Sequence, residues 1–226
     1  MFAKRLTDKH LFIIEIIITL VFCFAPLLYN NPYRLNIFLS WEGAYRLYLG
    51  QVPFRDFSLP MGYGYWVIPA IFFKIFGPFM YSLIKAQVFI NLVSVLCLRS
   101  ILKMLNVRPV VILMTVLVFC FSYVSKNFWP WYNHLVIVLE LLGFYFLFRA
   151  ILRSVGWRTI LNLALSAFFV LFAIFTKQDG GAIGLAIWLA LLVYDAWLTR
   201  SLQKIAVYSG SFIVMTLIAV LPLLQY

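Results

Sequence analysis

The chain is poor in charged residues, which make up only 11% of its 226 positions, whereas water-soluble domains carry about 25%. Hydrophobic residues make up 65%, and Phe, Trp and Tyr alone make up 19%. A soluble fold of this length has no core large enough to bury so much apolar surface. The shortage of charge therefore excludes a soluble globular domain. The sequence instead predicts an all-α integral membrane protein that crosses a lipid bilayer several times.

Acidic residues are especially scarce. Seven Asp and Glu stand against 18 Lys and Arg, which gives a net charge of +11. In a soluble protein such an excess would indicate nucleic-acid binding. Here the basic residues form short clusters between apolar runs, a pattern that sets orientation in a membrane. We therefore expect the lipid bilayer as a partner and no nucleic acid.

Cysteine is also rare. Cys23, Cys97 and Cys120 each lie inside an apolar run, with neither CxxC spacing nor a neighbouring histidine. They are expected to be small hydrophobic residues and not disulfides or metal ligands. The first apolar run, 11–28, is longer than a signal-peptide core and has no small-x-small cleavage site after it, so we expect a retained helix.

Eight long apolar runs are present, and seven of them are predicted to span the membrane. A span needs about 20 residues. The run 63–76 has 14 residues, about 21 Å of helix, and it lies between Pro60 and Gly77-Pro78. We expect it to be a helix in the outer interface. The expected spans are 11–28, 79–98, 109–124, 134–148, 159–175, 181–198 and 205–222, in a single domain.

The distribution of basic residues supports seven spans. If 63–76 does not cross, eleven basic residues fall on one face and five on the other. If it does cross, every later loop changes sides, and the inner face keeps only five basic residues, Lys4, Arg5, Lys9, Lys126 and Lys177. The positive-inside rule favours the first arrangement. It places the N-terminus in the cytoplasm, and the long connection 29–78 on the outer face.

The connection 29–78 contains two acid–base pairs. Residues 36–50 have the apolar spacing of an amphipathic helix on the membrane surface, and Glu42 and Arg46 are four residues apart on it, as in a helical ion pair. The simplest interpretation is that pair alone, which contributes little to stability when exposed. Arg55 and Asp56 form the second pair, after a turn at Gly50 and Pro53.

The order of motifs in this connection resembles the GT-C glycosyltransferases, multi-span enzymes that take a sugar from a polyprenyl-phosphate donor. Their first outer loop carries D-E-G-x-Y, then G-x-x-P-Y-R-D-F, then a Pro-rich P-P/M-G-Y-W stretch, and an apolar segment ending in F-G. This chain reads Trp41-Glu42-Gly43-Ala44-Tyr45, then Gly50-Gln51-Val52-Pro53-Phe54-Arg55-Asp56-Phe57, then Pro60-Met61-Gly62-Tyr63-Gly64-Tyr65-Trp66, and then Phe76-Gly77. The resemblance extends to Lys85 and more loosely to Thr176-Lys177-Gln178-Asp179-Gly180-Gly181.

The chain departs from the family pattern in two respects. The family's catalytic acid opens D-E-G-x-Y, and Trp41 stands in that position here. Three alternatives follow: Glu42 is the base, the alignment is shifted, or Asp56 is the base. Family members also run well past 400 residues, so the resemblance implies that these 226 residues correspond to the N-terminal part of such an enzyme.

The resemblance implies a reaction at the outer face of the bacterial inner, or plasma, membrane. A carboxylate would deprotonate an unidentified acceptor, which attacks the sugar while the polyprenyl phosphate leaves. Glu42 and Asp56 are the expected catalytic residues. The expected substrate-binding residues are Arg46, Arg55, Tyr63, Lys85, Lys177 and Asp179. No resident cofactor or metal site is expected, although a divalent cation is compatible with the reaction.

Two rival interpretations stay open at this point. The first is a non-catalytic transporter or assembly subunit for lipid-linked glycans, and the second is an inactive fragment of such an enzyme. A transporter would place its polar residues at the midplane of the membrane, where the sequence offers mainly Glu140. Polar residues that converge at the outer face would favour the enzyme.

Overall fold

The computed structural model describes residues 8–28, 35–57, 62–152 and 156–224, and this part of the chain is all-α. Seven helices are long and apolar enough to cross a membrane, which confirms the predicted fold class. They are α1 (Asp8–Phe24, continued by the 3-10 turn Ala25–Leu28), α4 (Met80–Met104), α5 (Pro109–Ser122, followed by the 3-10 turn Val124–Lys126), α6 (Tyr132–Ile151), α7 (Trp157–Thr176), α8 (Gln178–Thr199) and α9 (Gln203–Leu224). Two shorter helices, α2 (Leu35–Tyr48) and α3 (Gly64–Phe76), complete the described part.

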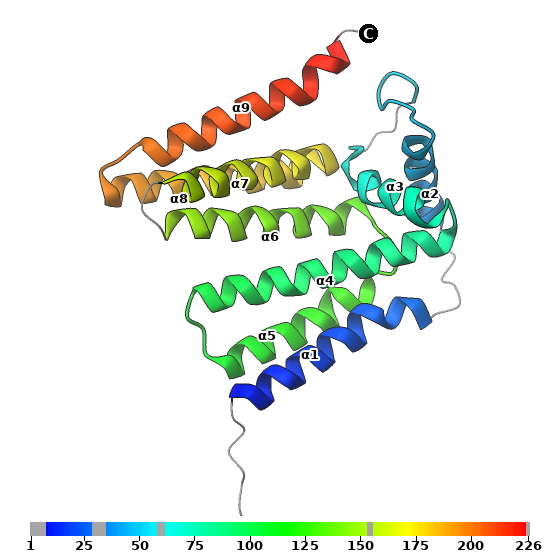
Figure 1. Cartoon of the computed structure of the whole chain (residues 1–226), viewed down its shortest axis with the longest axis horizontal. Coiled ribbons are helices and arrows are strands. Elements are labelled where there is room, and N and C mark those ends of the chain that lie inside the picture. Colours follow the sequence, from blue (N-terminus) through cyan, green and yellow to red (C-terminus); the bar gives the residue numbers. More distant parts are fainter. Residues whose placement is uncertain (1–7, 29–34, 58–61, 153–155, 225–226) are drawn as a thin grey trace, which may run out of the picture.

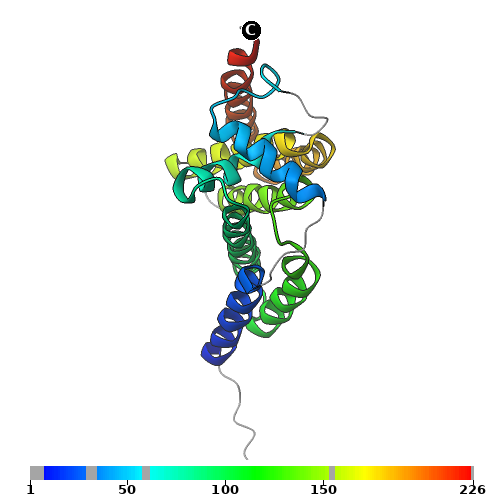
Figure 2. The ribbon, with the colours of Figure 1, turned by 90° about the vertical axis from the view of Figure 1, so that its right-hand side faces the viewer.

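The long helices lie side by side in a row, with α1 and α5 at one edge and α9 at the other (Figure 1). Their connections alternate between the two ends of the bundle. The α4–α5, α6–α7 and α8–α9 connections share one end with the start of α1. The α5–α6 and α7–α8 connections share the other end, which also carries α2 and α3 (Figures 1 and 2). We call these the basic end and the capped end.

Helix α3 does not have the length of a span. Its 13 residues give about 20 Å of helix, whereas a hydrocarbon core is about 30 Å thick. It ends at Gly77, whose φ of 83° is a conformation that side-chain-bearing residues rarely adopt, and the Gly77 amide bonds the Phe73 carbonyl. The expected short helix between the first and second spans is present, and it is shorter than each of the seven helices that could cross a membrane.

Apolar side chains both fill the bundle and cover its outside. Three buried clusters hold the helices together. The first joins α2, α3, α4, α6 and α7, the second joins α6 to α9, and the third joins α1, α4 and α5. Many large hydrophobic residues, such as Val21, Val118 and Ile183, are exposed on the outer surface. A surface of this kind suits contact with lipid, because acyl chains solvate apolar groups that water would not.

Polar side chains tie the spans together. Glu15 of α1 pairs with Arg99 of α4 at 2.6 Å, and Lys204 of α9 pairs with Asp195 of α8 at 3.2 Å. Ser166 of α7 donates to the Gly143 carbonyl and accepts from the Trp188 indole N–H. The three cysteines are buried and free, as expected.

Candidate functional site

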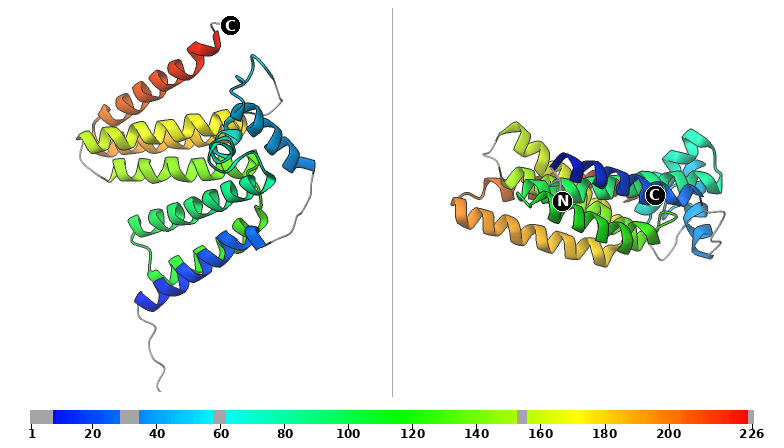
Figure 3. Two further views of the ribbon diagram at one scale, coloured as in Figure 1. Left: turned by 45° about the vertical axis from the view of Figure 1, so that its right-hand side comes forward. Right: turned by 90° about the horizontal axis from the view of Figure 1, so that it is seen from below.

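Six of the eight expected site residues come from three elements that meet at the capped end, while Tyr63 directly precedes α3 and Lys85 lies in α4. The three elements are α2, the turn that follows it through Phe57, and the junction between α7 and α8, with α3 between them (Figure 3). All eight residues lie in the described part of the chain. Their contacts differ, and the differences decide which chemistry each can perform.

Glu42 and Arg46 form the helical ion pair that the sequence predicts. The Glu42 Oε1 accepts from Arg46 Nη2 at 2.7 Å and from Nε at 3.1 Å. The carboxylate is 48% exposed, and no described residue donates a hydrogen bond to its second oxygen. Glu42 is thus held in a fixed direction while one oxygen stays open to a ligand or to water.

The neighbouring Trp41 has a structural role. Its indole N–H donates to the Pro78 carbonyl at 3.0 Å, and its ring stacks on Tyr45. It therefore points to the turn between α3 and α4. Successive residues of an α-helix are turned by about 100°, so Glu42 points in a different direction from the position where the GT-C pattern has its acid.

Asp56 is bound much more completely than Glu42. Arg55 donates to both carboxylate oxygens at 2.9 Å, and the Val52 amide donates to Oδ2 at 2.8 Å. These hydrogen bonds, that of Arg55 first, lower the pKa of Asp56 to about 2. A carboxylate with so low a pKa is a weak base, because base strength falls with pKa. Asp56 instead closes the turn between Pro53 and Phe57.

Arg46 connects α2 to this turn. Its guanidinium lies over the Phe57 ring, 5.3 Å from the centroid, and donates to the Gln51 side-chain oxygen at 3.4 Å. Neither Gln51 nor Phe57 is among the site residues expected from the sequence. A signal was present for Gln51, which lies five residues beyond Arg46 and directly after the helix-ending Gly50, whereas Phe57 lies eleven residues beyond Arg46.

Tyr63 bridges the turn and the α7–α8 junction. Its ring contacts Phe54 on one side, at 5.9 Å between centroids, and Phe175 of α7 on the other, at 5.4 Å. Burial raises the pKa of the Tyr63 phenol, so it stays protonated at neutral pH. Tyr63 can therefore orient a substrate by hydrogen bonding or stacking, but it is no base.

Two glycines allow the start of α3 to lie close against the end of α7. A Cβ on Gly62 would lie 2.1 Å from the Phe175 carbonyl oxygen, and one on Gly64 would lie 2.4 Å from Thr176 Oγ1. Glycines among aromatic residues allow another group to approach the backbone closely. The admitted group is the end of α7.

Lys177 and Asp179 stand at the junction that α3 contacts. Lys177 Nζ lies 3.4 Å from Asp179 Oδ2, and the Asp179 carboxylate also accepts from the Gly180 amide at the start of α8. An acid in the first turn of a helix is favoured by the helix dipole. The pair is long and exposed, so Lys177 can turn to an anion at small energetic cost.

Lys85 lies apart from the other expected residues. Its ammonium is 4.0 Å from the centroid of Phe76 and 5.4 Å from that of Tyr81, at the far end of α3. Within the described residues, no hydrogen bond, ion pair or ring contact links it to the turn or to the α7–α8 junction. The structure thus connects seven of the eight residues through neighbouring contacts and leaves Lys85 on the α3–α4 side.

No protein-family model, curated protein or solved structure matches this chain. Its function is therefore inferred from its own residues.

Each carboxylate of the candidate site is paired. Glu42, Asp56 and Asp179 each pair with one cation, Arg46, Arg55 and Lys177 respectively. An incoming phosphate must therefore compete with a carboxylate for any of these three cations. Within the described residues, no three His, Cys, Asp or Glu side chains gather closely enough to hold a metal ion. A divalent cation would need ligands from the substrate.

Proposed function

We propose that this chain is a membrane glycosyltransferase of the GT-C kind, acting alone or as part of a longer protein. It would move a sugar from a polyprenyl-phosphate donor to an acceptor at the capped end. The observation that carries the proposal is the contrast between two carboxylates, since Glu42 keeps one oxygen open at a fixed direction while Asp56 has both oxygens bound.

In the proposed reaction, Glu42 takes the proton of an acceptor hydroxyl or amine. The acceptor atom forms a bond to the anomeric carbon, and the bond from that carbon to the phosphate oxygen breaks. The electron pair leaves with the polyprenyl phosphate. A positioned general base of this kind contributes roughly 10²–10⁴-fold to the rate, and nearby cations stabilise the phosphate as its charge grows.

The cations fit this scheme in different ways. Lys177 has the longest ion pair of the three at the capped end, 3.4 Å, so it is the one most readily diverted to the donor phosphate. Arg46 and Arg55 hold the carboxylates and shape the turn. Lys85 lies against Phe76, and it would contact the phosphate only of a donor that enters from the α3–α4 side.

We propose that the capped end faces outward from the plasma membrane and that the N-terminus is cytoplasmic. The basic residues concentrate at the basic end, in the connections after α4, α6 and α8, and the positive-inside rule assigns such an end to the cytoplasm. A polyprenyl-phosphate donor would then keep its chain in the bilayer and present its sugar to Glu42 from the outer leaflet.

The activity is tested with membranes that contain the overproduced chain and a panel of radiolabelled polyprenyl-phosphate hexoses and pentoses. Loss of label from the lipid-linked donor, with label appearing in a second product, is the expected result. Vector-only membranes are the control. If no donor is consumed, in the presence or absence of Mg²⁺, the chain is not an active transferase by itself.

A non-catalytic transporter of lipid-linked glycans is the second candidate, and one observation favours it. Glu140 lies in the middle of α6, and its carboxylate packs against Gly184 of α8, where a Cβ would be 3.0 Å from Oε1. No recorded ion pair of the described residues involves it. An ionisable side chain at this depth commonly serves transport. Movement of a lipid-linked sugar from one leaflet of a proteoliposome bilayer to the other, without consumption of that sugar, would favour this candidate.

A further inference from the structure

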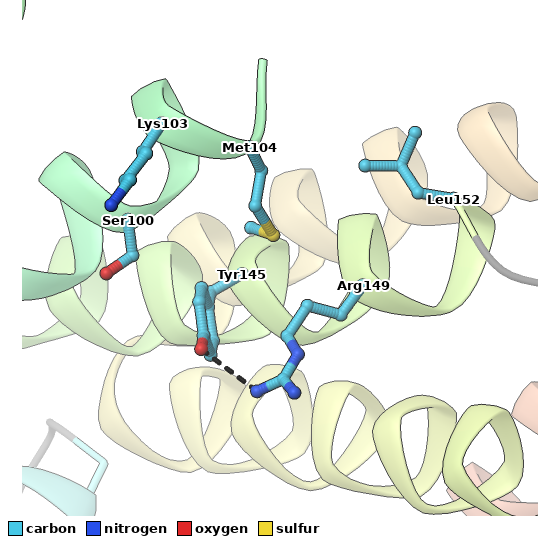
Figure 4. A pocket seen from close by; sticks show the side chains of 6 residues that line it. All are labelled: Ser100, Lys103, Met104, Tyr145, Arg149 and Leu152. Carbon is cyan, nitrogen blue, oxygen red and sulfur yellow. Dashed lines mark hydrogen bonds between the residues drawn. The ribbon is translucent and has the colours of Figure 1, made fainter. Parts of the chain in front are cut away.

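A second polar site lies at the basic end of α4 and α6, at the opposite end of the bundle from Glu42. A pocket of about 430 Å³ opens between the end of α4 and the end of α6 (Figure 4). Its walls are Ser100, Lys103, Met104, Tyr145, Arg149 and Leu152. A volume of this size suits a small ligand group.

The charge in this pocket is entirely positive. Lys103 and Arg149 line it, and no carboxylate does. A second pocket of about 290 Å³, between α6 and α7, shares Arg149 and adds Arg158, again without a carboxylate. All seven Asp and Glu of the chain lie in its described part, and none forms an ion pair there with Lys103, Arg149 or Arg158. Lys103 also lines a third pocket, beside α1, and that one does contain carboxylates, those of Asp8 and Glu15.

The hydrogen-bond donors of the pocket are arranged for an anion. Arg149 Nη1 donates to the Tyr145 hydroxyl at 3.0 Å, as the dashed line in Figure 4 shows. Because that hydroxyl accepts from Arg149, its own proton remains available to a ligand. The guanidinium and the Tyr145 hydroxyl can thus donate together, and the Lys103 ammonium adds positive charge to the wall of the same pocket. Hydrogen bonds from charged donors to phosphate oxygens are among the strongest in proteins.

The pocket also has apolar walls that are open to the outside. Met104 and Leu152 line it, and Leu152 is 60% exposed. Trp157, which lines the adjoining pocket, is 69% exposed, and an exposed tryptophan at a span terminus is typical of the headgroup region of a bilayer. Cations beside lipid-facing apolar side chains match a ligand that is anionic at one end and apolar at the other.

We propose that this pocket binds the phosphate of an anionic phospholipid from the leaflet at the basic end. Basic pockets between transmembrane helices commonly hold lipid headgroups in this way. The proposal is independent of sugar transfer, since it uses no residue of the capped end. A free phosphate has the same anionic chemistry but would make no use of the apolar walls.

Native mass spectrometry of the purified full chain tests this proposal, with phosphatidylglycerol and phosphatidylcholine added in equal amounts. Phosphatidylglycerol should be retained preferentially. The double variant Lys103→Gln/Arg149→Gln should bind it at least about tenfold more weakly, because two charged donors are lost. The matched control is Arg108→Gln/Arg200→Gln, which removes the same charge at the same end outside the pocket and should bind like the wild type.

Further arms separate the alternatives. Tyr145→Phe keeps the ring and should weaken binding less than the double variant, and the thermal unfolding of every variant in zwitterionic detergent shows whether it is folded. Equal loss in the Arg108/Arg200 control would overturn the proposal, because it would mean general charge attraction. Displacement of phosphatidylglycerol by millimolar inorganic phosphate would also overturn it in favour of a soluble anion. So would a wild-type protein with no preference between the two lipids.

Discussion

Trp66 of α3 lies directly against Gly43 of α2, so closely that a Cβ on Gly43 would be 2.0 Å from the indole ring. The indole N–H also donates to the Leu39 carbonyl of α2. This contact joins α2, the helix of Glu42, to α3, which directly follows Tyr63 and its ring contact with Phe175 of α7. The glycine that follows Glu42 thus has a packing function, apart from any role in chemistry.

Gly43→Ala should therefore loosen α2 from α3. Trp66 is almost fully buried and cannot move aside freely, and overpacking of this kind costs roughly 1–3 kcal/mol of unfolding free energy. Thermal unfolding of the purified protein measures the effect. The matched control is Gly210→Ala in α9, where a Cβ would meet nothing within 4 Å, and it should leave the stability equal or slightly higher. Equal loss in both variants would contradict the proposed contact.

The ion pair between Asp195 and Lys204 should fasten α9 to the rest of the bundle. Both side chains are buried, and Lys204 Nζ also donates to the Ile151 carbonyl at 3.0 Å. Lys204→Met should destabilise the protein by about 3–5 kcal/mol, because it leaves a buried charge without its partner. The double variant Asp195→Asn/Lys204→Met should recover much of that loss. A double variant as unstable as the single one would show that the pair itself is unimportant.

The orientation of the chain is tested by cysteine labelling. In a background without the three native cysteines, a membrane-impermeant maleimide should label positions 56 and 177 in intact cells. Positions 103 and 153 should react only after permeabilisation. Arg153 lies outside the described residues. Asp56 follows α2 and Lys177 lies between α7 and α8, at the capped end, whereas Lys103 lies in the last turn of α4, at the basic end. Labelling of position 103 from outside would reverse the proposed orientation.

The turn at Asp56 should resist acid. Its pKa is lowered to about 2 from an ordinary value of 3.8. A lowered pKa stabilises the folded form at pH values above the ordinary one, and the benefit is lost as the pH falls through about 2. The Val52 amide donates a hydrogen bond to Asp56. This amide should stay protected from hydrogen exchange from pH 8 to about pH 4. Asp56→Asn should reduce that protection across this range. Wild-type protection that already falls near pH 5 would contradict the lowered pKa.

The sequence predicts those features of this protein that depend on nearby residues or on long apolar runs. Seven spans follow from hydropathy, and the pairs of Glu42 with Arg46 and of Arg55 with Asp56 follow from spacings of four and one. The short helix 63–76 follows from its length and from its flanking proline and glycine.

Contacts between residues far apart in the sequence could not be predicted in the same way. The pairing of Glu15 with Arg99, the bridge from Tyr63 to Phe175 and the packing of Trp66 on Gly43 each need two elements brought together in space. The isolation of Lys85 beside Phe76 is a fact of the same kind. A sequence shows which residues could interact, whereas the packing of the helices decides which ones do.

The most direct test of the proposed function compares Glu42→Gln with Asp56→Asn in the lipid-linked sugar transfer assay, in membranes with equal amounts of each protein. Both substitutions keep the shape of the side chain and remove its charge. We predict that Glu42→Gln lowers the transfer rate by roughly 10²–10⁴-fold, the contribution of a general base, with normal folding and insertion. Asp56→Asn should retain most of the activity, since both oxygens of Asp56 are already bound. Near-normal transfer by Glu42→Gln would contradict the assignment of Glu42 as the base.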